Sequence, residues 1–198
     1  KMSAYVHGYT RLFCSPDGIR WLAAGDGART GDRTTFFYNP FRDRWVFSIR
    51  APGPLAGAKV RARIYWESAD FFAFDDRIWG LPEAAALPSG EFFQRLHARA
   101  QSEGGWPPGT EAVLWTGADS ADPRWDEFPQ VAPQLYNLDA VAYESVLLGL
   151  FSVWRGDFRA DARTPAAREQ DAAGRPKSNE LFVGFSRDGF HWTRPDRR

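Results

Sequence analysis

Short apolar or alternating runs, separated by turns rich in Gly, Pro, Asn and Asp, dominate the pattern along the chain. Runs of about four to eight residues between such turns are typical of β-strands. The predicted strands are Tyr9 to Cys14, Ile19 to Leu22, Thr34 to Tyr38, Arg44 to Arg50, Lys59 to Glu67, Phe72 to Trp79, Asp139 to Tyr143, Val146 to Trp154, Glu180 to Phe185 and Phe190 to Thr193. In contrast, the segment from Gly90 to Ser102, preceded by Ser89, has apolar residues at helical spacing and predicts a capped helix.

A strand–turn–strand repeat organises these runs. Ser15-Pro-Asp-Gly-Ile-Arg-Trp21 reappears as Ser186-Arg-Asp-Gly-Phe-His-Trp192, and Ser68-Ala-Asp-Phe-Phe-Ala-Phe74 is a degenerate copy between them. If one unit has about 50–60 residues, the first and second copies are one unit apart, and the second and third copies are two units apart. Four short strands in a unit of this size predict an all-β protein built from the blades of a β-propeller.

The predicted blades divide the chain into four parts. Residues 1–24 supply the outer strands of one blade, 32–80 form a second blade, 81–115 are a helical insertion and linker, and 116–198 form a third blade. About two and a half blades do not close a ring, and they leave strand edges unpaired. We therefore expect the remainder of the propeller to come from the same longer polypeptide or, alternatively, from an associated chain.

Composition and charge limit the classes of partner that we expect this protein to bind. The 198 residues include 16 Phe, 9 Trp and 6 Tyr, and aromatic residues favour strands. Lys plus Arg and Asp plus Glu are both 25, so we expect no basic face for nucleic acid. The longest apolar stretch, Val146 to Trp154, is less than half of the roughly 20 residues that span a membrane. We expect no membrane partner and no signal peptide.

The sequence predicts no metal site and no cofactor. His7, His97 and His191 have no partners at the spacing that metal ligands require. Cys14 is the single cysteine, which excludes an internal disulfide and a cysteine-based metal site. We interpret Cys14 as a buried thiol on a predicted strand.

Three aspartates occupy the repeated turns. Asp17, Asp70 and Asp188 lie between the third and fourth strands of their units. Because an aspartate accepts hydrogen bonds from backbone N–H groups two residues on, we expect these side chains to cap their own turns.

Asp32 and Asp139 have a different place in the predicted fold. Each starts an innermost strand, where side chains of neighbouring blades converge on the central funnel. Two carboxylates aimed at one funnel are suited to acid and base catalysis on a glycosidic bond. The alternative is that each caps its strand or pairs with an arginine such as Arg33.

Several segments resemble the five-bladed propeller glycosidases. Gly31-Asp-Arg-Thr-Thr-Phe-Phe-Tyr-Asn-Pro40 is similar to their Arg-Asp-Pro strand start. The same pattern is matched by Tyr136-Asn-Leu-Asp-Ala-Val-Ala-Tyr-Glu-Ser145, by Leu147-Leu-Gly-Leu-Phe151 and by Glu180-Leu-Phe-Val-Gly-Phe-Ser-Arg-Asp-Gly189. Outside residues 81–112, the chain resembles the glycoside hydrolase family 32 and 43 superfamily, especially bacterial proteins described as family-32 N-terminal-like. The resemblance implies a five-bladed β-propeller and a hydrolase of carbohydrate metabolism.

The resemblance also implies roles for single residues. The family uses three acidic residues from three successive inner strands, and the first would lie upstream of Lys1. By position, Asp32 resembles the aspartate that stabilises the transition state, and Asp139 resembles the acid/base glutamate with one methylene fewer. We therefore expect this chain alone to lack a complete catalytic set. The expected substrate-binding residues are those beside the two aspartates: Arg33, Tyr136 and Asn137.

Two other functions fit the same sequence. A non-catalytic carbohydrate-binding propeller would keep the funnel without turnover, and the shorter side chain at Asp139 favours it. A protein-interaction propeller would use the repeated turns or the helix of residues 81–112 to contact a partner.

Overall fold

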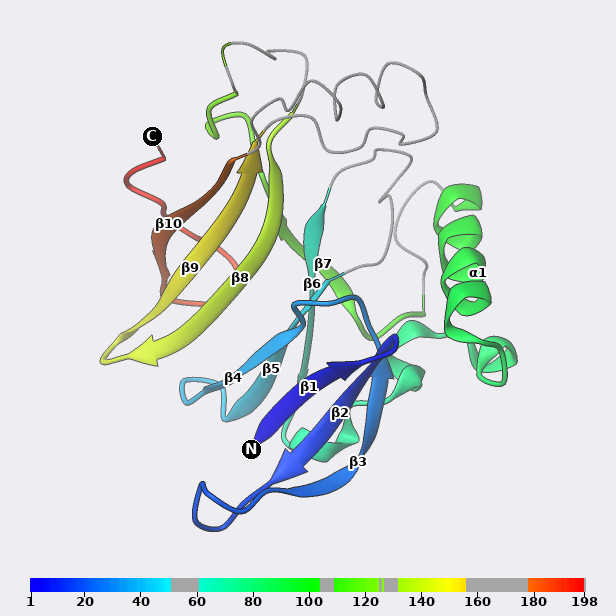
Figure 1. Ribbon diagram of the computed structural model, residues 1–198. Helices are drawn as coiled ribbons and strands as arrows, with labels where there is room; N and C mark the ends of the chain where they lie inside the picture. The colour runs from blue at the N-terminus through cyan, green and yellow to red at the C-terminus, as the bar shows by residue number, and fades with distance from the viewer. Residues whose placement is uncertain (51–60, 104–108, 125, 127–131, 156–177, 198) are drawn as a thin grey trace.

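The computed structural model describes residues 1–50, 61–103, 109–124, 126, 132–155 and 178–197. Within these ranges the chain is mostly β, as the sequence predicts, and its strands form three antiparallel sheets (Figure 1). In each sheet, strands that are consecutive in the sequence lie next to one another. This up-and-down order keeps most of the strand connections local.

The first sheet contains β1 (Met2–Val6), β2 (Tyr9–Cys14) and β3 (Leu22–Arg29) in the order β1-β2-β3. The predicted strand from Ile19 to Leu22 is wrong, because β3 begins only at Leu22. The preceding residues belong to the turn: Asp17 accepts from the backbone N–H of Ile19 at 2.9 Å, and Trp21 Nε1 donates to the Gly18 carbonyl at 3.1 Å. The turn is therefore longer than its Asp-Gly pair indicates.

The second sheet contains β4 (Thr35–Asn39), β5 (Arg44–Arg50), β6 (Ala62–Ser68) and β7 (Val113–Gly117) in that order. The predicted strands 34–38, 44–50 and 59–67 overlap its first three strands, and β5 has the predicted bounds; residues 59 and 60 lie outside the described residues. Its fourth strand is β7, so the predicted strand from Phe72 to Trp79 is wrong. That segment forms short 3-10 helices, η1 (Phe71–Ala73) and η2 (Asp76–Trp79), followed by η3 (Pro82–Ala84) and the helix α1 (Ser89–Ser102).

A missing glycine explains this difference. In the other two turns, Gly18 and Gly189 have φ angles of 75° and 85°, the left-handed conformation that glycine adopts without strain. Phe71 occupies the equivalent place in the degenerate copy. There Asp70 caps η1 instead, accepting from the backbone N–H of Phe72 at 2.9 Å. The chain therefore coils over the sheet where the other two copies reverse direction.

The third sheet contains β8 (Gln134–Tyr143), β9 (Val146–Arg155) and β10 (Ser178–Ser186), with β9 in the centre. The predicted strand from Phe190 to Thr193 is reduced to a single antiparallel bridge between Phe185 and Thr193. β8 starts earlier than the sequence predicts, because Leu135 and Leu138 belong to the core and extend the pairing with β9.

The middle sheet is buried on both faces. One face, which includes Phe47 and Ile64, packs with Leu12 of β2, with the 3-10 segment and with α1. The opposite face, which includes Phe37 and Tyr65, packs with the third sheet. Figure 1 shows α1 on the side of the molecule away from β8 to β10. The first strands of the second and third sheets, β4 and β8, contact each other, and this contact positions the candidate site.

The capping role expected for the turn aspartates is confirmed. Asp17 Oδ1 accepts from the backbone N–H groups of Ile19 and Arg20, both at 2.9 Å. Asp188 Oδ1 accepts in the same way from the backbone N–H groups of Phe190 and His191, both at 2.8 Å. The backbone hydrogen bonds lower the pKa of Asp17, and the contact with the His191 side chain followed by the backbone hydrogen bonds lowers the pKa of Asp188. Together with the cap that Asp70 forms on η1, these contacts give the three carboxylates a structural role.

The turn at Asp188 makes a prediction that NMR can test. His191 Nδ1 lies 2.6 Å from Asp188 Oδ2, and this contact raises the pKa of His191 above its usual value of 6.5. We expect Asp188→Asn to lower the His191 pKa, measured by NMR titration of the imidazole. Since the contact raises the folded pKa of His191 and lowers that of Asp188, it stabilises the fold most between their usual pKa values of 6.5 and 3.8. The effect is lost as pH rises through the folded pKa of His191 or falls through that of Asp188. An unchanged His191 pKa in the variant would contradict the pairing.

Candidate functional site

The candidate site is organised around Tyr136, where β8 departs from regular pairing. The register of β8 on β9 shifts between Leu135 and Asn137, so Tyr136 lies at a β-bulge. Bulges redirect side chains and are common beside functional sites. Here Tyr136 Oη donates to Asp32 Oδ2 at 3.2 Å. The bulge thus brings two of the expected site residues together.

Asp32 is held from a second side by an arginine. It lies shortly before β4 and forms an ion pair with Arg50, the last residue of β5. The side chains are 42% and 23% exposed, so the pair is half-buried and one side of Asp32 remains accessible. The arginine partner is thus Arg50 and not the neighbouring Arg33 that the sequence suggests.

Arg33 takes part through both its backbone and its side chain. Its φ angle is 61°, which is uncommon for a residue other than glycine. Its carbonyl accepts from Arg63 Nη2 at 2.7 Å, and its guanidinium carbon lies 5.9 Å from the centre of the Tyr136 ring. The loop before β4 is therefore fixed on the tyrosine.

Arg63 is the internal support of the site. It is fully buried, and its guanidinium donates to Ser48 Oγ at 3.0 Å, to the Tyr136 carbonyl at 3.2 Å and to the carbonyls of Arg33 and Ser48. The guanidinium of Arg63, on β6, is thus connected by hydrogen bonds to β5, to the loop before β4 and to the bulge of β8. Burial lowers the pKa of Arg63 to about 9, which leaves it a cation at neutral pH.

A further arginine lies on the same side of β6. The guanidinium carbon of Arg61 is 5.1 Å from the ring centre of Tyr136 and 4.6 Å from that of Trp154. Burial, and next the charge of Arg50, lower the pKa of Arg61. We call the group formed by Asp32, Arg33, Arg50, Arg61, Arg63 and Tyr136 the Tyr136 site.

Asn137 and Asp139 form a separate pair. Asn137 Nδ2 donates to Asp139 Oδ2 at 2.8 Å. Asp139 is exposed in the interior of β8 opposite Leu150. The expectation that Asp139 starts an inner strand is therefore wrong. Its charge still acts on Arg63, whose pKa it raises against the effect of burial.

Sequence reasoning missed the three arginines that support the site. Arg61 and Arg63 alternate with Ala62 and Ile64, the pattern of a strand with one face in water. Arg50 is the cross-strand partner of Arg63. The signal that could have pointed to them is the pairing of Arg50 with Arg63, with Arg61 just before β6, because like charges directly opposite each other are unfavourable without an anion nearby.

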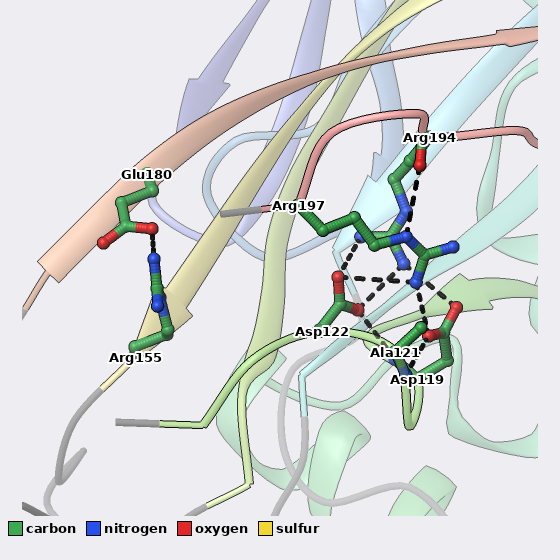
Figure 2. Close-up of polar contacts among 7 residues, drawn as sticks. All are labelled: Asp119, Ala121, Asp122, Arg155, Glu180, Arg194 and Arg197. Carbon is green, nitrogen blue, oxygen red and sulfur yellow. Dashed lines mark hydrogen bonds and ion pairs between the residues drawn. The ribbon is translucent and has the colours of Figure 1, made fainter. Parts of the chain in front are cut away.

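A second polar cluster lies near the end of the chain and has a structural role (Figure 2). Arg194 donates to both oxygens of Asp122, at 2.7 and 2.8 Å, and Arg197 pairs with Asp119. Asp122 Oδ2 also accepts from the backbone N–H of Asp119 at 2.8 Å. Every charge in this cluster has an opposite partner, so it fastens residues 194–197 to the turn at 119–122.

The described part of the chain holds no group of three or more His, Cys, Asp or Glu side chains placed to bind a metal ion. None of the helices in the described ranges combines the length and apolar character that crossing a membrane requires. Comparisons with protein-family models, with curated proteins and with solved structures gave no match to this chain.

Proposed function

We propose that this chain is part of a β-propeller of the glycoside hydrolase family 32 and 43 type, which binds a saccharide at the Tyr136 site and cleaves a glycosidic bond. The observation that carries the proposal is the meeting of Asp32 and Tyr136 where the first strands of two neighbouring sheets touch. Inner strands of adjacent blades meet in this way at a propeller's funnel. The proposal takes the three antiparallel sheets of Figure 1 as three successive blades.

The outer face of the third sheet supports the propeller. It exposes apolar side chains that a neighbouring blade would cover: Val141, Leu150, Leu181, Val183 and Phe185. Contiguous apolar patches on a protein surface mark packing or interaction sites. In the proposed ring, a further sheet from the same polypeptide or an associated chain packs on this face as the third sheet packs on the middle one.

Asp32 is suited to one step of glycoside hydrolysis. It is paired with Arg50 and accepts from Tyr136, so it acts as a fixed carboxylate rather than a proton donor. A carboxylate in this position stabilises the positive charge that develops on the sugar ring in the transition state. In the hydrolase, Asp139 would protonate the leaving oxygen, and Arg33, Tyr136 and Asn137 would contact the sugar.

The placement of Asp139 favours a second candidate function. Asp139 accepts from Asn137 in the interior of β8, whereas Asp32 is bound by Arg50 and Tyr136. A propeller that binds carbohydrate without cleaving it needs the Tyr136 site and not the second carboxylate. The two functions share a ligand class and differ in turnover.

Hydrolysis of a glycoside panel by the full-length protein tests the proposal. The panel contains fructosides, arabinosides, xylosides and galactosides. We expect turnover of one substrate, and a decrease of at least about 100-fold in Asp32→Asn and in Asp139→Asn. Asp26→Asn, at an exposed aspartate of the first sheet, is the matched control and should retain activity.

The remaining outcomes separate the candidates. Saccharide binding without turnover would replace the hydrolase by the binding propeller. Full activity in Asp32→Asn would contradict the assigned role of that residue, and neither binding nor turnover would overturn both functions.

A further inference from the structure

We infer that this chain binds a second copy of itself head to tail, through two surfaces that the strand–turn–strand repeat makes complementary. One surface is the turn of residues 15–21 between β2 and β3, which we call the Ile19 turn. The other is the exposed side of β10 around Val183, which we call the Val183 face. The contact needs no saccharide, so the inference goes beyond the proposed function.

The first and last copies of the repeat form the same turn. In both, one aspartate oxygen accepts from the backbone N–H groups two and three residues further on, at 2.8 or 2.9 Å. In both, Nε1 of the tryptophan that ends the turn donates to the carbonyl of the turn glycine, at 3.1 Å in the first copy and 2.9 Å in the last. Ile19 therefore occupies the place of Phe190, and Trp21 occupies that of Trp192.

The last turn packs on the neighbouring middle sheet. The ring centre of Phe190 lies 4.9 Å from that of Tyr65 on β6, and the ring centre of Trp192 lies 6.1 Å from that of Trp115 on β7. Trp115 Nε1 also donates to the Gly189 carbonyl at 2.7 Å. This contact identifies the surface that fits such a turn, which is the face of an adjacent antiparallel sheet.

The Ile19 turn has the same conformation but is exposed. The side chain of Ile19 is 82% exposed and that of Trp21 is 36% exposed. Exposed apolar side chains that lie close together mark interaction sites. By analogy with the last turn, we expect these two residues to pack on a sheet face equivalent to the one that carries Tyr65.

The Val183 face is equivalent to the face that carries Tyr65. Both residues lie three positions before the serine that begins a copy of the repeat. Each also pairs with the fifth residue of the preceding strand, in β5 and in β9 respectively. Leu12 has the same position before the first copy. Leu12 and Tyr65 are 2% and 6% exposed because each packs against the next sheet, whereas Val183 is 57% exposed.

A second copy of the chain carries both surfaces in the arrangement that the contact requires. The first sheet packs on one side of the middle sheet and the third sheet packs on the other. The Ile19 turn and the Val183 face therefore belong to the two outer sheets of the row. A contact between different surfaces of identical chains is heterologous, and it joins each copy to the next through the same interface.

The test is the mass of the protein in solution and its response to two substitutions. Sedimentation velocity is measured from about 1 to 100 µM, the range in which an interface of moderate affinity associates. We expect the mass to rise with concentration to at least twice that of one chain. Ile19→Lys and Val183→Lys, both at exposed positions, should each weaken association by at least about tenfold.

A mixture of the two variants tests whether the contact is head to tail. It retains one intact interface, between Val183 of the Ile19→Lys chain and Ile19 of the Val183→Lys chain. We therefore expect the mixture to form a complex of two chains and to grow no further. Phe41→Lys, at an exposed phenylalanine between β4 and β5, is the matched control and should associate as the unchanged protein does.

Four results would overturn the inference. They are a single chain at about 100 µM, association that survives either substitution, a mixture that stays dissociated, and an equal loss in Phe41→Lys. Circular dichroism checks that each variant is folded, and Leu181→Lys, at a 69% exposed position of β10, replaces Val183→Lys if that variant unfolds. Each of these results leaves the proposed function standing, because hydrolysis of the glycoside panel is measured separately.

Discussion

Arg194→Met is expected to lower the free energy of unfolding by about 3–5 kcal/mol, the usual cost of removing one partner of a buried ion pair. The side chains of Arg194 and Asp122 are 3% and 0% exposed, and the two hydrogen bonds between them form a fork. Without the guanidinium, the partners that the described residues leave to the Asp122 carboxylate are a weak ion pair with Arg197 at 3.6 Å and the backbone N–H of Asp119. Urea denaturation followed by tryptophan fluorescence measures the loss.

Two further variants distinguish the loss of stability caused by an unpaired buried charge from the loss caused by removing an arginine charge as such. Arg197→Met removes the more exposed arginine of the same cluster, whose partner Asp119 is half exposed, so we expect a loss of at most about 1 kcal/mol. The double variant Arg194→Met with Asp122→Leu should recover part of the stability, because no buried charge is left without its partner. Equal losses in Arg194→Met and Arg197→Met would contradict the structural role assigned to the buried pair.

Arg63→Met is expected to destabilise the protein by about 2–4 kcal/mol and to abolish saccharide binding. Each hydrogen bond to a charged group contributes about 1.5–3 kcal/mol, and part of this loss is offset because a buried cation is removed. The variant leaves the carbonyls of Arg33 and Tyr136 without their common donor. The loop before β4 and the bulge of β8 then lose the group that holds them together. The binding surface that these two segments form is lost as a result.

Arg44→Met is the matched control for Arg63. Arg44 begins β5 at the other end of the sheet, and its side chain donates to the carbonyl of the adjacent Asp43 at 2.8 Å. We expect a loss of under about 1 kcal/mol and normal saccharide binding. If Arg63→Met bound saccharide as the unchanged protein does, Arg63 would not be the support of the site.

Features with a local cause were predictable from the sequence. The capping by Asp17 and Asp188 follows from their own turns, and glycine at the left-handed position lets the chain reverse there. β5 was predicted with its exact bounds, because its apolar core is flanked by turn residues. The prediction of a strand after the degenerate turn was wrong for an equally local reason: Phe71 replaces glycine there, and the segment forms 3-10 helices instead.

Features set by distant contacts were not predictable. Arg63 reads as a solvent-facing residue of an alternating strand, and only the third sheet, packed on that face, makes it a buried support. The bulge at Tyr136 has the same origin: it shifts the register of β8 on β9 and accompanies the contact between Tyr136 and Asp32. A shift of one residue changes which face each side chain occupies, and the sequence pattern carries no sign of it.

The long connection between β6 and β7 has a consequence for the kinetics of folding. These strands are neighbours in the sheet, although residues 69–112 separate them along the chain. Contacts between distant residues form slowly, because closing a long loop costs entropy before pairing begins. The ring of Phe74 stacks on Phe47 of β5 at 4.0 Å, so docking of the 3-10 segment shortens the loop that remains to be closed. The rate at which the middle sheet gains its last strand is thereby coupled to the packing of an aromatic pair outside that strand.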